Sequence, residues 1–232
     1  MRLFGYSSIQ IDSNTLLFYL ATESPNMPII TIAGYKGGIC KSTTAIAVAS
    51  LLSAEGKTLV IDGDPNRSAS VWAREGKLPF TVVGEREAAK VMRSESFEWI
   101  VIDTAARPSK AEIEELARGC DLLISPCPPD MLSLDALVLM AQDLPQETNW
   151  RVLISAVPPH PQTDGNDLRE ALTAKGYPTF KQGIRFYKAY KNAVTEGLPI
   201  QKTKGGKIGW RDWQTLKPEI LRAIVKPSSA KS

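Results

Sequence analysis

The segment from Gly34 to Ser42 has the composition of a phosphate-binding loop that leads into a helix. Gly37 and Gly38 allow the backbone to turn so that successive N–H groups point at phosphate oxygens, and the helix adds the positive end of its dipole. We expect Lys41 to neutralise nucleotide phosphates and the Ser42 hydroxyl to ligate Mg²⁺. The alternative is a glycine-rich turn in which Lys41 and Ser42 only start a helix.

Two acidic motifs follow later apolar runs. Asp62 and Asp64 stand in Asp-Gly-Asp-Pro-Asn after one run, and Asp103 ends another in the form of a Walker B motif. Asp103 is expected to hold Mg²⁺ through water, because Mg²⁺ keeps most of its hydration shell. The segment after it, Thr104–Arg107, is expected to sense the γ-phosphate. Taken alone, the first motif could equally be a turn that closes a strand, where Asp and Gly are common.

These motifs need a parallel sheet to bring them together. Short, almost continuous apolar runs predict strands buried on both faces; they are Ile29–Ala33, Thr58–Ile61, Phe80–Val83, Trp99–Ile102, Leu122–Ile124 and Val152–Val157. The segments between or after them predict helices at Ser42–Ala54, Lys110–Ala117, Leu132–Leu144, Asp167–Lys175, Tyr187–Glu196 and Trp213–Val225. The alternation predicts an α/β fold with a three-layer, doubly wound, mostly parallel sheet, in which ligands bind beyond the carboxyl ends of the strands.

Composition limits the class of protein. The chain has 232 residues, 43% hydrophobic and 23% charged, with a net charge of +3, which fits one globular domain at 27–226. We expect residues 1–26 to be an extension, with Met27 a possible true start, and 227–232 to be a flexible tail. Three cysteines without a CxxC pair and a single histidine, His160, argue against disulfides, structural zinc and a Ser-His-Asp triad. No run is long enough to span a bilayer, so a cytoplasmic protein is expected.

The loop resembles the deviant Walker A box of the ParA/MinD family of P-loop ATPases, Lys-Gly-Gly-x-x-Lys-Ser/Thr-Thr, and the resemblance extends from Met27 to about Val225. It implies that Lys36 crosses an ATP-bound homodimer to contact the partner's nucleotide, and that Lys36 and Asp64 are catalytic, with Asp64 orienting the attacking water. It also implies that Asp62 supports the Mg²⁺ shell with Ser42 and Asp103. The implied nucleotide-binding residues are Lys36, Gly37, Gly38, Ile39, Cys40, Lys41, Ser42 and Thr43.

Cys40 departs from the family pattern, which has glycine before the phosphate-loop lysine. A side chain there crowds the phosphates unless φ stays negative. One interpretation is a tolerated small residue; the other is weakened or redox-sensitive nucleotide binding, since a helix N-terminus beside two lysines lowers a thiol pKa. The adenine contacts near Val157–Pro159 stay unassigned.

Basic residues gather late in the chain with aromatic residues between them, which favours a surface for DNA phosphates. The candidates are Arg185, Lys188, Lys191, Lys204, Lys207 and Arg211. The alternative is a set of ordinary solvated helix faces. A MinD-type membrane anchor is disfavoured because the tail from Lys226 lacks bulky apolar residues.

In length and layout the chain is similar to the small, ParF-like partition proteins of the ParA type. This resemblance implies ATP-dependent dimerisation, non-specific binding to nucleoid DNA, and slow hydrolysis stimulated by a small centromere-binding or cargo-adaptor protein. The implied cargo is plasmid or chromosomal DNA; a protein organelle, as for McdA-type carboxysome positioning, stays open. The rival classes are a metabolic or metal-cluster ATPase and a nucleotide-binding module with little catalysis.

Overall fold

The computed structural model describes residues 27–159 and 163–224; the predicted extension, the predicted tail and His160 lie outside the described residues. Six strands form one sheet in the order β3-β2-β4-β1-β5-β6, and every pairing is parallel. The strands are β1 (Ile29–Ile32), β2 (Thr58–Asp62), β3 (Thr81–Gly84), β4 (Trp99–Asp103), β5 (Leu122–Cys127) and β6 (Trp150–Ile154). The predicted α/β architecture is confirmed.

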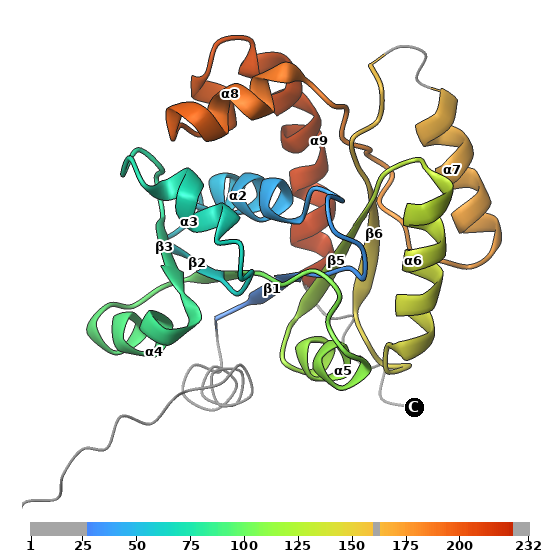
Figure 1. The fold of residues 1–232 in the computed structure, drawn as a ribbon, viewed down its shortest axis with the longest axis horizontal. Coiled ribbons are helices and arrows are strands. Elements are labelled where there is room, and N and C mark those ends of the chain that lie inside the picture. Colours follow the sequence, from blue (N-terminus) through green and yellow to red (C-terminus); the bar gives the residue numbers. More distant parts are fainter. Residues whose placement is uncertain (1–26, 160–162, 225–232) are drawn as a thin grey trace, which may run out of the picture.

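Helices cover both faces of this sheet, as Figure 1 shows. One face of the sheet is covered by α2 (Lys41–Leu52), α3 (Ser68–Ala73), α8 (Lys188–Glu196) and α9 (Gly206–Ile224), together with the 3₁₀ turn η1 (Ile200–Lys202). The other face is covered by α4 (Glu85–Ser94), α5 (Lys110–Arg118), α6 (Met131–Asp143) and α7 (Thr163–Ala174). Successive side chains of a strand point to opposite faces of the sheet: Ile30 packs into the core on the first face and Ile29 into the core on the second. This explains the continuous apolar runs, because both faces of each central strand are buried.

Several boundaries differ from the prediction. β5 continues to Cys127, and β6 ends at Ile154, after which Val157 forms only an isolated bridge with Arg185. Helix α9 begins at Gly206 rather than Trp213.

The helices α3 and α4 and the turn η1 were missed. Helix α4 is polar overall and fully buries only Ala88 and Ala89, so few large apolar residues mark it in the sequence, and α3 spans only six residues. None of the helices within 27–159 and 163–224 combines the length and apolarity needed to cross a bilayer.

Candidate functional site

The phosphate loop lies at the carboxyl edge of the sheet, between β1 and α2. Strand β1 sits between β4 and β5, so the chain winds away from it in both directions and leaves a crevice at this point. A cavity of about 450 Å³ opens there. Its lining comes from four parts of the described chain: Gly37, Gly38, Cys40, Lys41, Ser42, Thr43 of the loop; Asp64, Asn66, Ser68, Trp72; Ala106; and Val194 of α8. The predicted meeting of the phosphate loop with the segments after β2 and β4 is therefore confirmed.

The loop backbone takes up left-handed conformations at two positions. Gly38 has φ +77° and open space where a Cβ would project. Cys40 has φ 69° and ψ 26°, a conformation that glycine adopts freely and cysteine does not. The negative φ that would accommodate a side chain at this position is therefore not present. The expected low thiol pKa is wrong, because burial raises the pKa of Cys40.

Lys41 is buried, with 6% of its surface exposed, and its Nζ donates to the backbone oxygen of Lys36 at 3.4 Å. Burial lowers the pKa of Lys41, while Asp103 and Asp64 act in the opposite direction. A buried ammonium with one long hydrogen bond retains donors for anionic oxygens.

Asp103 ends β4 and is fully buried. Among the described residues, no donor forms a hydrogen bond of standard geometry with either of its carboxylate oxygens. Burial raises its pKa to about 7, and Asp62 and Asp64 add to the rise, while the Ser42 hydroxyl and Lys41 oppose it. Buried polar groups are normally paired, so this orphaned carboxylate fits a site that accepts a hydrated Mg²⁺.

Asp62 lies beside Asp103 in the register of β2 and β4, but its carboxylate is already engaged. It accepts hydrogen bonds from the backbone N–H of Asp64 at 3.2 Å and from the Ser70 backbone N–H and hydroxyl at 2.8 and 2.6 Å. Asp62 thus fixes the turn that carries Asp64 and the start of α3.

Asp64 lines the cavity and is 8% exposed. One of its oxygens accepts hydrogen bonds from the backbone N–H and the side-chain amide of Asn66, at 2.8 and 3.0 Å. The residue that replaces the family's glutamine therefore holds Asp64 in place. An oriented carboxylate facing a phosphate-sized cavity can align a water molecule for in-line attack.

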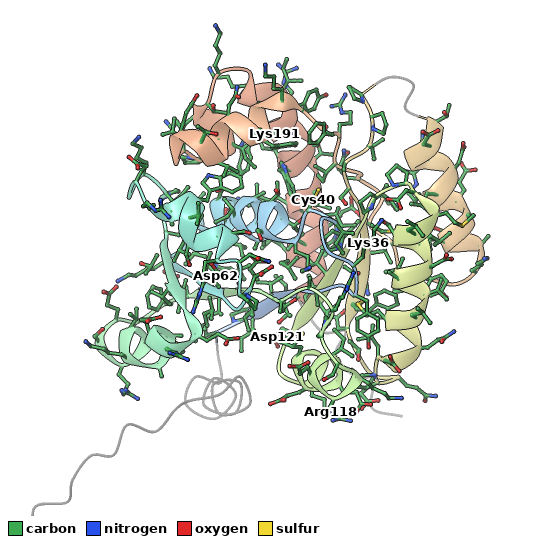
Figure 2. All side chains as sticks on the ribbon, in the orientation of Figure 1. Lys36, Cys40, Asp62, Arg118, Asp121 and Lys191 are labelled. Atoms are coloured by element: carbon green, nitrogen blue, oxygen red, sulfur yellow. The ribbon has the colours of Figure 1, made fainter. Side chains whose placement is uncertain are left out.

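Lys36 turns away from this cavity. Its Nζ donates to Asp130 Oδ1 at 2.9 Å and to Ser133 Oγ at 3.0 Å, at the first turn of α6. Asp130 also caps α6 by accepting the Ser133 N–H. Figure 2 shows Lys36 on the α6 side of the loop and Asp62 on the α3 side.

The preceding residue, Tyr35, was missed by sequence reasoning. Its hydroxyl donates to Asp143 Oδ2 at 2.8 Å, and Lys110 pairs with the other oxygen of Asp143. Burial and this hydrogen bond raise the pKa of Tyr35. Because Asp130 and Asp143 flank α6, two adjacent loop residues bind opposite ends of one helix. No local sequence signal reveals this contact, since Tyr35 and Asp143 are 108 positions apart.

The predicted DNA-binding residues divide into two groups. Five have exposed side chains on α8, on the loop after η1 and on the first turns of α9: Lys188, Lys191, Lys204, Lys207 and Arg211. Lys191 marks this region in Figure 2. Arg185 differs, because its Nε donates to the buried Asp212 at 3.0 Å and a terminal nitrogen binds the other carboxylate oxygen.

Within the described part of the chain, no three His, Cys, Asp or Glu side chains gather closely enough to hold a metal ion on their own. A Mg²⁺ ion bound beside Ser42 and Asp103 therefore needs ligands from water and from a phosphate-bearing ligand, which suits this ion.

Comparison with known proteins identifies the family to which the chain belongs. The family model of the CobQ/CobB/MinD/ParA nucleotide binding domain matches residues 30–200. Maintenance of carboxysome distribution protein A from Gloeobacter kilaueensis is 32% identical over 184 residues, which covers 76% of this chain and 85% of that protein.

Two solved structures share the fold. The ATP complex of Cyanothece McdA has a TM-score of 0.64 at 15% identity and covers 89% of this chain and 99% of its own. The pNOB8 ParA bound to nonspecific DNA has a TM-score of 0.57 at 16% identity, covering 85% and 98%. On its family match and its sequence relative, the chain belongs to the ParA/MinD family of nucleotide-binding ATPases.

Proposed function

We propose that the protein is an ATP-dependent positioning ATPase that dimerises on ATP, binds DNA without sequence specificity and releases it after hydrolysis. The observation that carries this proposal is the meeting of a two-lysine phosphate loop with Asp64 at one cavity, while the orphaned, buried Asp103 interacts with Ser42 and Lys41 of the same loop. These are the groups that phosphoryl transfer requires, since it depends on positioning and charge compensation.

The residues have separate roles in this proposal. The loop N–H groups and Lys41 bind the phosphates, Ser42 and Asp103 hold Mg²⁺ with Asp62 supporting them, and Asp64 orients the attacking water. Mg²⁺ neutralises the charge on the phosphates. Lys36 leaves Asp130 and contacts the phosphates bound to the partner subunit. The exposed cations of α8 and α9 bind DNA phosphates in the dimer. We therefore expect the protein to be cytoplasmic and associated with the nucleoid.

The cargo has two candidates. The likeness in fold to pNOB8 ParA, which was solved on nonspecific DNA, is compatible with DNA as track and with plasmid or chromosomal DNA as cargo. The sequence similarity to a carboxysome distribution protein favours a protein assembly as the second candidate. In both cases a small adaptor protein links the cargo to the ATPase and stimulates hydrolysis.

The test measures three quantities for the wild type, Asp64→Ala and, as a matched control, Asp167→Ala on the exposed face of α7. They are ATP turnover with and without duplex DNA, mass in solution with ATP, and DNA retention at low salt. Asp64→Ala is expected to keep dimerisation and DNA binding and to lose turnover at least 100-fold. Wild-type turnover in Asp64→Ala contradicts the catalytic role. A wild type that neither dimerises nor retains DNA with ATP contradicts the function.

A further inference from the structure

A second cavity, of about 420 Å³, lies at the β6 edge of the sheet and shares no lining residue with the nucleotide cavity. Its walls are α7 and α9, and the segment 181–185 runs between them beside β6. Figure 1 shows α7 and α9 on either side of β6. Gly165, Asn166 and Arg169 come from one face of α7, and Arg211, Asp212 and Thr215 from one face of α9.

The lining of this cavity is strongly cationic. Among the described residues it contains Arg169, Lys181, Arg185 and Arg211 against a single carboxylate, Asp212, so its formal net charge is three positive. The whole chain carries only +3, which means that these few residues hold a charge equal to that of the entire protein. Such a concentration within one cavity attracts anions.

The one acidic group does not oppose an anion. Asp212 is 4% exposed, and it accepts hydrogen bonds from the Arg185 guanidinium and from the Arg185 backbone N–H at 3.1 Å. Asp212 is therefore neutralised within the wall and keeps Arg185 fixed at the cavity.

Two further cations, Arg169 and Lys181, line the same cavity. Arg169 donates one terminal nitrogen to the backbone oxygen of Lys181 at 2.7 Å, which orients its guanidinium beside Lys181. Lys181 itself has an exposed side chain, and its backbone N–H is tied to Glu219 of α9. A fixed guanidinium and an ammonium that line one cavity can both bind the oxygens of one phosphate group.

We propose that this cavity binds a backbone phosphate of DNA, and that Arg169 and Lys181 belong to the DNA-binding surface. The inference rests on the proposed function and extends its surface. Arg211 joins the two regions, because it lines the cavity and lies on α9 one turn beyond the exposed Lys207. A duplex bound across α8 and the start of α9 thus continues towards α7, onto Arg169 and Lys181, which precede the late basic run of the sequence.

The test compares Arg169→Gln/Lys181→Gln with the wild type and with a control pair of equal charge change, Lys175→Gln/Arg118→Gln, which lies outside the cavity. Affinity for a nonspecific duplex is measured with ATP at several salt concentrations. Each neutralised phosphate contributes about 0.9 to the slope of log K against log salt, so a variant that no longer holds this one phosphate is expected to lose about 0.9 from the slope and roughly 10-fold in affinity at 0.1 M salt. ATP binding and the control pair are expected to match the wild type.

The outcomes separate the alternatives. If the wild type binds DNA and the double variant binds it with the same affinity and slope, the proposal is overturned. In that case calorimetry with inorganic phosphate shows whether the cavity serves a free anion or none. A wild type that does not bind DNA overturns the proposed function as well, and this result is visible without any variant. Should Arg169→Gln melt at a lower temperature, Lys181→Gln alone is expected to reduce the slope, by at most about 0.9.

Discussion

The ammonium of Lys36 is bound to Asp130 within the same chain, although the family resemblance assigns this lysine to the partner's nucleotide. The side chains of the two residues are 32% and 47% exposed, so solvent screens the pair and it contributes at most about 1 kcal/mol. The contact is therefore weak enough to break when an ATP-bound partner offers phosphate oxygens. In our proposal, dimerisation must first release Lys36.

Asp130→Asn is expected to make this release easier. Asparagine caps a helix as well as aspartate does, so α6 keeps its cap while Lys36 loses its ion pair. The ATP concentration for half-maximal dimerisation is expected to fall about two- to fivefold, measured by light scattering, with an unchanged melting temperature. Asp135→Asn, an exposed residue of the same helix, is the control. An unchanged ATP requirement in Asp130→Asn shows that the ion pair does not restrain Lys36.

Cys40→Gly is expected to bind ATP more tightly. Cys40 lines the nucleotide cavity in a left-handed conformation that costs a non-glycine residue roughly 1–2 kcal/mol, so nucleotide binding must hold the loop in a conformation that glycine adopts freely. Equilibrium titration with a fluorescent ATP analogue is expected to give a Kd about three- to tenfold lower than that of the wild type. Cys40→Ala keeps the Cβ and the strain and is expected to stay within twofold of the wild type. Equal gains in both variants mean that the thiol, and not the backbone, weakens binding.

Asp103→Asn is expected to stabilise the nucleotide-free protein at pH 8. The folded pKa is raised from 3.8 to about 7, so between these values the folded state binds a proton that the unfolded state does not. The free energy of unfolding therefore falls as pH rises through this window and stays low above it. Because the asparagine amide is still buried, the gain is about 1–3 kcal/mol.

The measurement for Asp103→Asn is urea unfolding without nucleotide at pH 5 and pH 8, with Asp167→Asn as the control. Mg²⁺-dependent ATP binding by the same variant is expected to be lost. A variant that is no more stable than the wild type at pH 8 shows that Asp103 has a partner in solution.

Arg185→Gln is expected to destabilise the fold rather than only weaken DNA binding. The change leaves Asp212, 4% exposed, without its charged partner, and a broken buried pair costs about 3–5 kcal/mol. Denaturant unfolding is expected to show a loss of about 2–4 kcal/mol, since Arg185 is partly exposed. Lys188→Gln on exposed α8 is expected to change stability by less than about 0.5 kcal/mol. Similar stabilities for the two variants contradict the structural role of Arg185.

The sequence predicted the strands well because a parallel sheet buries both faces of its strands, which leaves continuous β-branched runs such as Ile29–Ile32. It also predicted that Asp64 and Asp103 meet the phosphate loop, since the carboxyl ends of parallel strands share one edge. Helix α4 escaped prediction because its sequence is mostly polar and the residues that it buries fully are two alanines.

The side-chain contacts of the site were harder to predict from the sequence. Lys36 and Asp130 are 94 positions apart, and only the strand order brings them together. The basic pattern around Arg185 could not show that its guanidinium serves Asp212, because the burial of Asp212 is a tertiary property. The left-handed φ of Cys40 could not be predicted either, because the geometry of the loop imposes it and a cysteine alone predicts a negative φ.

The strand order also determines when the chain can fold during its synthesis. Both neighbours of β1, β4 and β5, are encoded downstream, so Ile29–Ile32 leaves the ribosome with neither edge paired. At roughly 5–20 residues per second, β5 is complete about 5–20 s after β1. Until then at least one edge of this apolar strand, which will become the centre of the sheet, is open to pairing with other nascent chains.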